Sequence, residues 1–291
     1  MTKHLLAAVV LVLAAPVLGQ GVTLHHVHGL AFSADGRQLF IPIHTGLAVY
    51  EDGRWSAAPG PRHDYMGFVA AQDRFYSSGH PAPGSGLVNP FGLMRSRDAG
   101  RTWDKLGLQG ESDFHVLAVG YRTNAIYVFN PAPNSRMKTP GIYSTRNDGL
   151  GWRPAAAKGL PGQVIALAAH PADPNTVAAT TREGVFLSKD GGDTFARAAG
   201  GEALAAHFDL DGKHLWFSGH DGTPRLYRVA LDTPARTEIS LPPLPRDAVA
   251  YIAQSSAAPG AYAIATFERS VFIAADAGKT WRRIAERGRA Q

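Results

Sequence analysis

The chain has 291 residues, a formal net charge of +5 and 45% hydrophobic residues, which is enough for one large globular domain. It contains no cysteine, and this excludes disulfide bonds, thiolate metal ligands and cysteine nucleophiles. The positive charge is not gathered into a basic block or a basic–aromatic stripe, so we expect no nucleic-acid partner.

The first 19 residues are typical of a secretory signal peptide. Lys3 supplies a positive charge, residues 5–18 form an apolar run, and small residues precede Gln20. We expect cleavage after residue 19, a mature charge of +4 because only Lys3 is lost from the charged set, and a periplasmic or secreted protein. The apolar run is shorter than the about 20 residues of a membrane-spanning helix, and no other stretch approaches that length, so we expect no membrane span after cleavage.

A short motif of the form S-x-D-x-G-x-T-W recurs along the chain. Residues 96–103 read SRDAGRTW, 188–195 read SKDGGDTF, 274–281 read AADAGKTW, and 145–152 read the more divergent TRNDGLGW. The Asp or Asn side chain accepts hydrogen bonds from the N–H groups of a turn, and Gly adopts a backbone conformation that other residues resist. The motif therefore predicts a hairpin whose final aromatic residue packs on a sheet.

The spacing of these motifs predicts a repeat. The aromatic residues Trp103, Trp152, Phe195 and Trp281 are 49, 43 and 86 residues apart, and the last gap is twice 43. Trp55 lies 48 residues before Trp103, so six units should end near residues 55, 103, 152, 195, 238 and 281. Each unit reads as four short strands, which predicts an all-β, six-bladed β-propeller in one domain over residues 22–286. A seven-bladed propeller is the alternative, if residues 21–25 belong to a further blade.

Two long loops interrupt the period, at residues 78–90 and 130–140. Both fall between the second and third strands of their units. Long ordered loops often carry function, and the other interpretation is a rigid, proline-rich cover over one face.

The inner strands of the first three units bring polar residues to equivalent positions. His28, Met66 and His115 occupy one position, and His26, Asp64 and Asp113 lie two residues earlier, on the same face of each strand. Imidazole with thioether suits copper, and imidazole with carboxylate suits zinc. We therefore treat His26, His28, Met66 and His115 as candidate metal ligands, with packed core residues as the alternative.

Further polar residues fall on the loops of the same face. Histidines come mainly from the first two units, and pairs of Arg and Glu come from units four and six. The candidate ligand-binding residues are His44, His63, His80, Arg182, His220 and Arg269. The candidate catalytic acids and bases are Asp64, Asp113, Glu183 and Glu268, with Tyr65 as a candidate nucleophile. Arg with carboxylic acids suits the hydrolysis of acidic sugars, and ordinary solvated loop charge is the alternative. His170 and His207 fall in turns at the far ends of inner strands, and we predict structural roles for both.

Several segments together resemble a family. These are the S-x-D-x-G-x-T-W copies, HVHG at 26–29, HDYMGF at 63–68, SGHPAPGS at 78–85, DFH at 113–115 and NPAPNS at 130–135. They resemble exported bacterial propellers with Asp-box, or bacterial-neuraminidase, repeats, a group described as sialidase-like or glycosyl hydrolase-like. The resemblance implies a small-molecule or glycan ligand at the histidine-rich face, with glycoside hydrolysis as the candidate activity. The residues themselves leave two alternatives open: a non-enzymatic protein that binds copper or zinc, and a scaffold for a protein partner.

Overall fold

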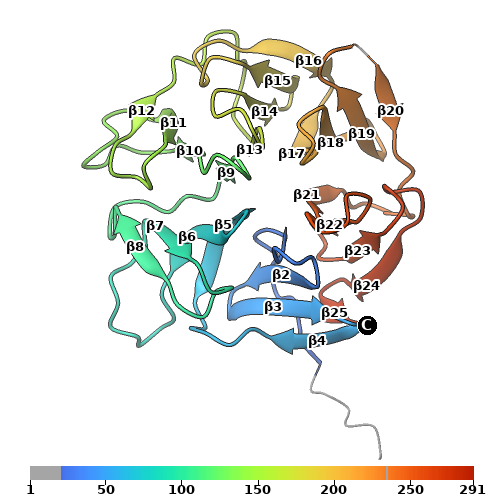
Figure 1. The fold of residues 1–291 in the computed structure, drawn as a ribbon, viewed down its shortest axis with the longest axis horizontal. Helices are drawn as coiled ribbons and strands as arrows, with labels where there is room; N and C mark the ends of the chain where they lie inside the picture. Colours follow the sequence, from blue (N-terminus) through green and yellow to red (C-terminus); the bar gives the residue numbers. More distant parts are fainter. Residues whose placement is uncertain (1–20, 234) are drawn as a thin grey trace, which may run out of the picture.

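The computed structural model describes residues 21–233 and 235–291, and all of its regular structure is β-strand. The strands form six sheets that stand as blades around a central axis (Figure 1). The predicted six-bladed β-propeller is therefore confirmed. The expected signal peptide, residues 1–19, lies outside the described residues. Within the described residues, no helix is long and apolar enough to cross a membrane.

Each blade is an antiparallel sheet whose strands follow one another in the chain. Blade one comprises β1 (Ala31–Phe32), β2 (Gln38–Ile43), β3 (Gly46–Glu51) and β4 (Arg54–Ala57). Blade two comprises β5 (Asp64–Ala71), β6 (Arg74–His80), β7 (Leu93–Ser96) and β8 (Asp104–Gly107). Blade three comprises β9 (Leu117–Val119), β10 (Ile126–Asn130), β11 (Gly141–Thr145) and β12 (Arg153–Pro154). Blade four comprises β13 (Ala166–Ala169), β14 (Val177–Thr181), β15 (Gly184–Ser188) and β16 (Ala196–Gly200). Blade five comprises β17 (Ala203–Phe208), β18 (His214–His220), β19 (Pro224–Ala230) and β20 (Arg236–Glu238). Blade six comprises β21 (Val249–Gln254), β22 (Tyr262–Thr266), β23 (Val271–Ala274), β24 (Arg282–Glu286) and β25 (Arg289–Ala290).

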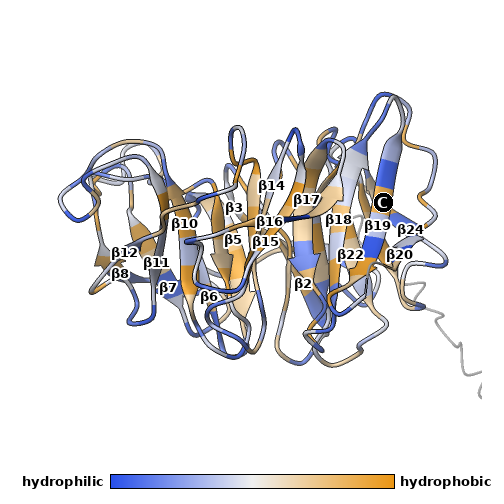
Figure 2. Cartoon of the chain, turned by 90° about the horizontal axis from the view of Figure 1, so that it is seen from above, coloured by the Kyte–Doolittle hydropathy of each residue, from blue (hydrophilic) through white to orange (hydrophobic). Residues whose placement is uncertain are grey.

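The sequence of each strand reflects its depth in the blade. The second strands are covered by neighbouring blades on both sides, so they read as nearly continuous apolar runs, and all five residues of β14 are buried. The outer strands face solvent, and all three residues of β20 are exposed. Figure 2 shows this pattern from the side, with hydrophobic strands through the middle of the disc and hydrophilic loops on its faces.

The hydrophobic core consists of six clusters, and each lies between two adjacent blades. Between blades five and six, Trp216 stacks on Tyr262 with ring centroids 4.4 Å apart. Between blades one and two, Phe40 packs edge-on against Phe75 with ring centroids 5.1 Å apart. Aromatic pairs of this kind add to the burial of apolar area, so each blade is stabilised mainly by its neighbours.

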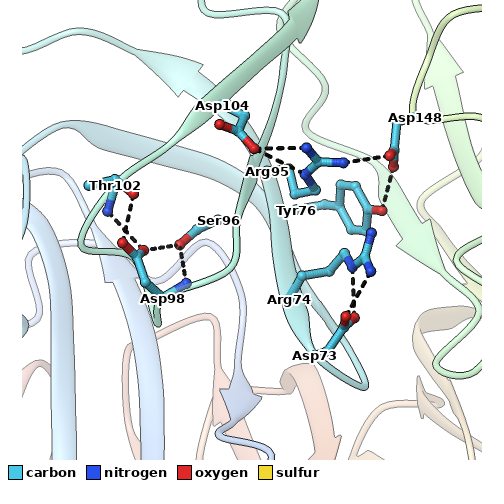
Figure 3. A network of polar contacts seen from close by, with 9 residues as sticks. All are labelled: Asp73, Arg74, Tyr76, Arg95, Ser96, Asp98, Thr102, Asp104 and Asp148. Atoms are coloured by element: carbon cyan, nitrogen blue, oxygen red, sulfur yellow. Dashed lines mark hydrogen bonds and ion pairs between the residues drawn. The ribbon is translucent and has the colours of Figure 1, made fainter.

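In each of the four repeated turns, a side-chain oxygen of Asp or Asn accepts from the N–H four residues later. Figure 3 shows the first of these turns. In the first, the Ser96 hydroxyl accepts from the Gly100 N–H, and the Asp98 carboxylate accepts from the N–H and the hydroxyl of Thr102. Equivalent bonds hold the turns at Asn147, Asp190 and Asp276. The aromatic residue precedes the fourth strand in these turns, so the units end a few residues later than the spacing predicts.

A polar network joins blades two and three beside the first turn (Figure 3). The Tyr76 hydroxyl donates to Asp148 at 2.6 Å, and Arg95 donates to the other oxygen of Asp148 at 2.6 Å. Arg95 also binds Asp104 at 2.8 Å. Asp148 therefore ties the third strand of blade two to the last turn of blade three.

The start of the described chain closes the ring. Thr23 forms an antiparallel bridge with Arg289, and the Leu24 N–H donates to the Gly288 carbonyl at 2.7 Å. Residues 21–25 thus extend the outer edge of blade six, and the seven-bladed alternative is wrong. Figure 1 shows the first blade, in blue, beside the last, in red.

One face of the disc carries both long loops. Asp64 at the start of β5 pairs with His80 at the end of β6, so the inner strands begin on the face where the second strands end. The loops at 81–92 and 131–140 leave from the same ends. We call this side the histidine face, and the four repeated turns lie on the opposite face.

Candidate functional site

The site begins where the inner strands of blades one, two and three touch. Gly29 bridges to Phe68, and a β-carbon on Gly67 would lie 2.1 Å from the Phe114 carbonyl oxygen. Only glycine fits at Gly67, because its φ of +54° is also left-handed. His28 and His115 stand on the two sides of this contact, and both line a central cavity of about 260 Å³.

The first group of polar residues is His26, His28 and His44, which we call the blade-one cluster. Each offers a ring nitrogen, and the three nitrogens lie within 4.8 Å of one another. The ring centroids are 4.3 to 5.7 Å apart. Asp64 reaches this cluster from blade two, with Oδ2 at 2.7 Å from His44 Nδ1 and Oδ1 at 3.7 Å from His28 Nε2.

Two buried atoms of this group lack hydrogen-bond partners within the described chain: His28 Nε2 and Asp64 Oδ1. Burial lowers the pKa of His28 to about 4, against the opposing effect of the Asp64 charge and with smaller contributions from His44 and His26. His28 is therefore neutral at pH 7, and one of its ring nitrogens carries a free lone pair. Unpartnered polar atoms are costly to bury, so these two atoms make the cluster a candidate ligand site.

The second group is His80, Asp113 and His115, which we call the blade-two/three cluster. His115 Nε2 lies 2.6 Å and His80 Nε2 lies 3.0 Å from Asp113 Oδ2. Burial acts to raise the pKa of Asp113, but the hydrogen bond from His115 and the neighbouring histidines outweigh it and lower that pKa. The same hydrogen bond raises the pKa of His115. The second oxygen of Asp113 is buried without a partner in the described chain.

Other candidates of blade two have different surroundings. Met66 is buried and does not line the central cavity, whereas Gly67 does. His63 accepts the Ala82 N–H at 3.0 Å and packs on Phe91, so it holds the start of the long loop. Tyr65 is fully buried and donates to the Pro61 carbonyl, and burial raises its pKa well above the usual range.

The structure does not bring the Arg and Glu candidates together. Arg182, Glu183 and Glu268 are exposed, and Arg269 donates to the His25 carbonyl at 3.1 Å. Among the polar contacts of residues 21–233 and 235–291, none joins any two of these four. His220 is half-buried at the end of β18, outside both clusters.

Two features were missed by sequence reasoning. Asn89 lies in the long loop of blade two, with Oδ1 at 2.7 Å from His80 Nδ1. No motif in the sequence marks this asparagine as a partner of His80. The predicted turn at His207 is wrong, because His207 lies inside β17 and lines the central cavity, with Nε2 buried and unpartnered within the described chain. His170 has the expected structural role, since it contacts the Gly212 carbonyl at 2.8 Å.

A third group of possible ligands, Asp209 with Asp211 and His214, lies at the end of blade five on the opposite face. Its buried member is already satisfied, because Asp209 accepts from Arg228 at 2.7 Å and from the Tyr262 hydroxyl at 2.6 Å. This group therefore stabilises the blade, and the two clusters of the histidine face are the stronger candidate site.

Comparisons with known proteins bear on the fold. No protein-family model matches the chain, and no curated protein matches it. Among solved structures, the chain is similar to a GH74 xyloglucanase from Xanthomonas campestris, with a TM-score of 0.54 and 18% identity over 91% of this chain and 47% of that one. It is also similar to a GH74 enzyme from Niastella koreensis, with a TM-score of 0.56 and 15% identity over 91% of this chain and 46% of that one. A third similar structure is YCF48 bound to D1 peptide, with a TM-score of 0.52 and 16% identity over 90% of this chain and 81% of that one. The chain spans about half the length of the two GH74 enzymes, and the likeness places it among the β-propellers by fold alone.

Proposed function

We propose that this protein binds a divalent transition-metal ion on the histidine face, with His26, His28 and His44 as ligands. The observation that carries the proposal is the convergence of three ring nitrogens within 4.8 Å of one another, at a point where buried His28 Nε2 has no partner in the described chain. Imidazole nitrogen suits zinc and copper, and the absence of cysteine leaves no thiolate to compete with it.

The surroundings of the cluster support metal binding. Asp64 holds His44 through Nδ1, which leaves Nε2 of that ring free to bind an ion. A carboxylate behind a metal-bound histidine fixes the tautomer and the orientation of the ring. Three protein ligands leave a further coordination position for water or a small ligand. We also propose that the mature protein acts in the periplasm or outside the cell, which the signal-like N-terminus supports.

Metal titration of the purified protein tests this proposal. We expect the double substitution His26→Ala with His44→Ala to weaken the binding of one zinc or copper ion at least about tenfold. His220→Ala, on the same face but outside both clusters, is the matched control and should leave binding unchanged. Equal metal affinity in the wild type and the double variant would reject the cluster as a metal site.

The second candidate function is the binding of a glycan on the same face, as in a sialidase-like Asp-box propeller. It is supported by the likeness to GH74 enzymes and by the two long loops on this face. Hydrolysis needs a carboxylic acid that is protonated near neutral pH, whereas the pKa of Asp113 is lowered and Glu183 and Glu268 stand apart on exposed loops. Calorimetry with xyloglucan oligosaccharides and sialosides tests glycan binding, and a turnover assay with the same compounds tests hydrolysis. The absence of binding rejects this candidate.

A further inference from the structure

We propose that His80, Asp113 and His115 form a second divalent-metal site, so that the histidine face holds two ions. The inference that the face holds two ions rests on the proposed function, because the first ion is the one proposed for the blade-one cluster. The second site depends only on its own three residues, which come from the end of β6 and from the segment that leads into β9.

The geometry of the three side chains already approaches that of a metal site. Both Nε2 atoms lie close to one oxygen of Asp113, at 2.6 and 3.0 Å, and the three ligand atoms lie within 4.8 Å of one another. Ligands of a tetrahedral zinc ion lie about 2.0–2.2 Å from the metal, and hence roughly 3.4 Å from each other. A cation that replaces the shared protons would therefore require only small side-chain rotations.

The composition of the cluster favours a divalent cation. Two histidines and one carboxylate form a recurrent ligand set, and the carboxylate is itself a ligand here, whereas the three proposed ligands of the blade-one cluster are all imidazoles. The Asp113 side chain is only 16% exposed, and its Oδ1 is buried without a partner in the described chain. An ion or an ion-bound water would satisfy this atom, which the protein alone leaves unpaired.

Asn89 gives the second site its own orienting contact. Its Oδ1 lies 2.7 Å from His80 Nδ1, so the amide oxygen can accept the Nδ1 proton. A cation that replaces the proton between Nε2 and Asp113 would then meet the Nε2 lone pair. The Asp64–His44 contact has the same relationship to the blade-one cluster. Asn89 lies in the 81–92 loop, and this contact assigns a role to the extra length of that loop.

The two clusters open onto one space. His28 belongs to the first, His115 belongs to the second, and both line the central cavity on the two sides of Gly67. Each site takes ligands from different blades, so either can be removed by substitution while the other keeps all of its ligands.

Zinc stoichiometry of the purified, full-length mature protein tests the second site. After equilibrium dialysis against a buffered zinc solution, we expect two zinc ions per wild-type chain by elemental analysis. His80→Ala with His115→Ala should bind one, His26→Ala with His44→Ala should bind one, and the quadruple variant should bind none. His220→Ala should bind two. Far-ultraviolet circular dichroism and unfolding midpoints confirm that each variant is folded, and Asp113→Asn replaces the His80 and His115 double variant if that variant does not fold.

The outcomes separate this inference from the proposed function. One zinc in the wild type, lost only with the His26 and His44 substitutions, overturns the second site and leaves the first. One zinc lost only with the His80 and His115 substitutions supports the second site and contradicts the first. Two zinc ions retained after substitution of His80 and His115 overturn the second site, and no zinc in the wild type overturns both.

Discussion

The α-carbon of Gly67 lies against the carbonyl oxygen of Phe114, so that a β-carbon built on this glycine would be only 2.1 Å from that oxygen. The contact joins the inner strand of blade two to the segment that leads into the inner strand of blade three. His115 follows Phe114 directly, and Asp113 precedes it. The position of the blade-two/three cluster therefore depends on a residue without a β-carbon at position 67.

We predict that Gly67→Ala displaces the segment around Phe114 and weakens the binding of the second zinc ion. The left-handed conformation alone should cost about 1–2 kcal/mol of unfolding free energy, and the backbone clash should add to it. Gly53→Ala is the matched control, because Gly53 also has a positive φ, +80°, but has no atom within 4 Å of a built β-carbon. Chemical denaturation and zinc titration measure both effects. Equal losses in the two variants would show that the contact with Phe114 is unimportant.

Asn89 should act as a positioning residue for His80. We expect Asn89→Ala to weaken the second zinc ion by roughly 10- to 100-fold, because His80 loses the acceptor for its Nδ1 proton. Asn89→Asp keeps an acceptor at the same place and should restore most of the affinity. Competition with a chelator measures the zinc affinity, and the first ion serves as the internal control. A loss that Asn89→Asp does not restore would contradict an orienting role.

Asp148 should contribute more stability than Asp104, although both bind Arg95. Asp148 also accepts from the fully buried Tyr76, whereas the Asp104 side chain is 60% exposed. Asp148→Asn leaves a single carbonyl acceptor where two donors converge, so we expect a loss of about 1.5–3 kcal/mol in unfolding free energy. The control Asp104→Asn removes an exposed ion pair and should cost below about 1 kcal/mol. Urea unfolding compares the two, and similar costs would contradict the network in Figure 3.

His207 should make the protein less stable in acid. Burial lowers its pKa from 6.5 to about 4, against a smaller opposing effect of Asp209. Between these pH values the unfolded chain binds a proton that the folded chain does not, so stability falls as the pH drops from 6.5 to 4 and the effect levels off below 4.

The test is the pH dependence of unfolding free energy in the wild type and in His207→Phe, which suits the largely apolar cavity wall. We expect the wild type to lose on the order of 3 kcal/mol more than the variant over this interval. Parallel curves for the two proteins would show that His207 is protonated as readily in the folded state as in the unfolded state.

The blade count was predictable because the repeated turns are local structures. Asp98, Asp190 and Asp276 each accept hydrogen bonds from residues three or four positions later, so the motif and its geometry are contained in one short segment. Once the turns are located, their spacing sets the number of blades and the phase of the strands. The N-terminal segment was harder to place, because its pairing partners Gly288 and Arg289 lie at the other end of the chain.

The candidate site was only partly predictable. The gathering of His28, Asp64 and His115 on one face followed from strand phase alone. The strand alignment put Met66 beside the two histidines, but the register of β5 shifts between Met66 and Val69, and Gly67 lines the cavity instead. Such irregularities depend on contacts between blades, which a single sequence does not display.

The N-terminal closure makes the proposed metal site and the integrity of the ring mutually dependent. Leu24 completes the edge of the last blade, and His26 and His28 follow within four residues. Opening the seam would free the segment that carries two of the three proposed ligands, so a bound ion opposes opening by linkage. At a free-ion concentration 100 times the dissociation constant, this amounts to about 2.7 kcal/mol. The free energy that keeps the seam closed would thus rise with the logarithm of the free-metal concentration in the compartment of the protein.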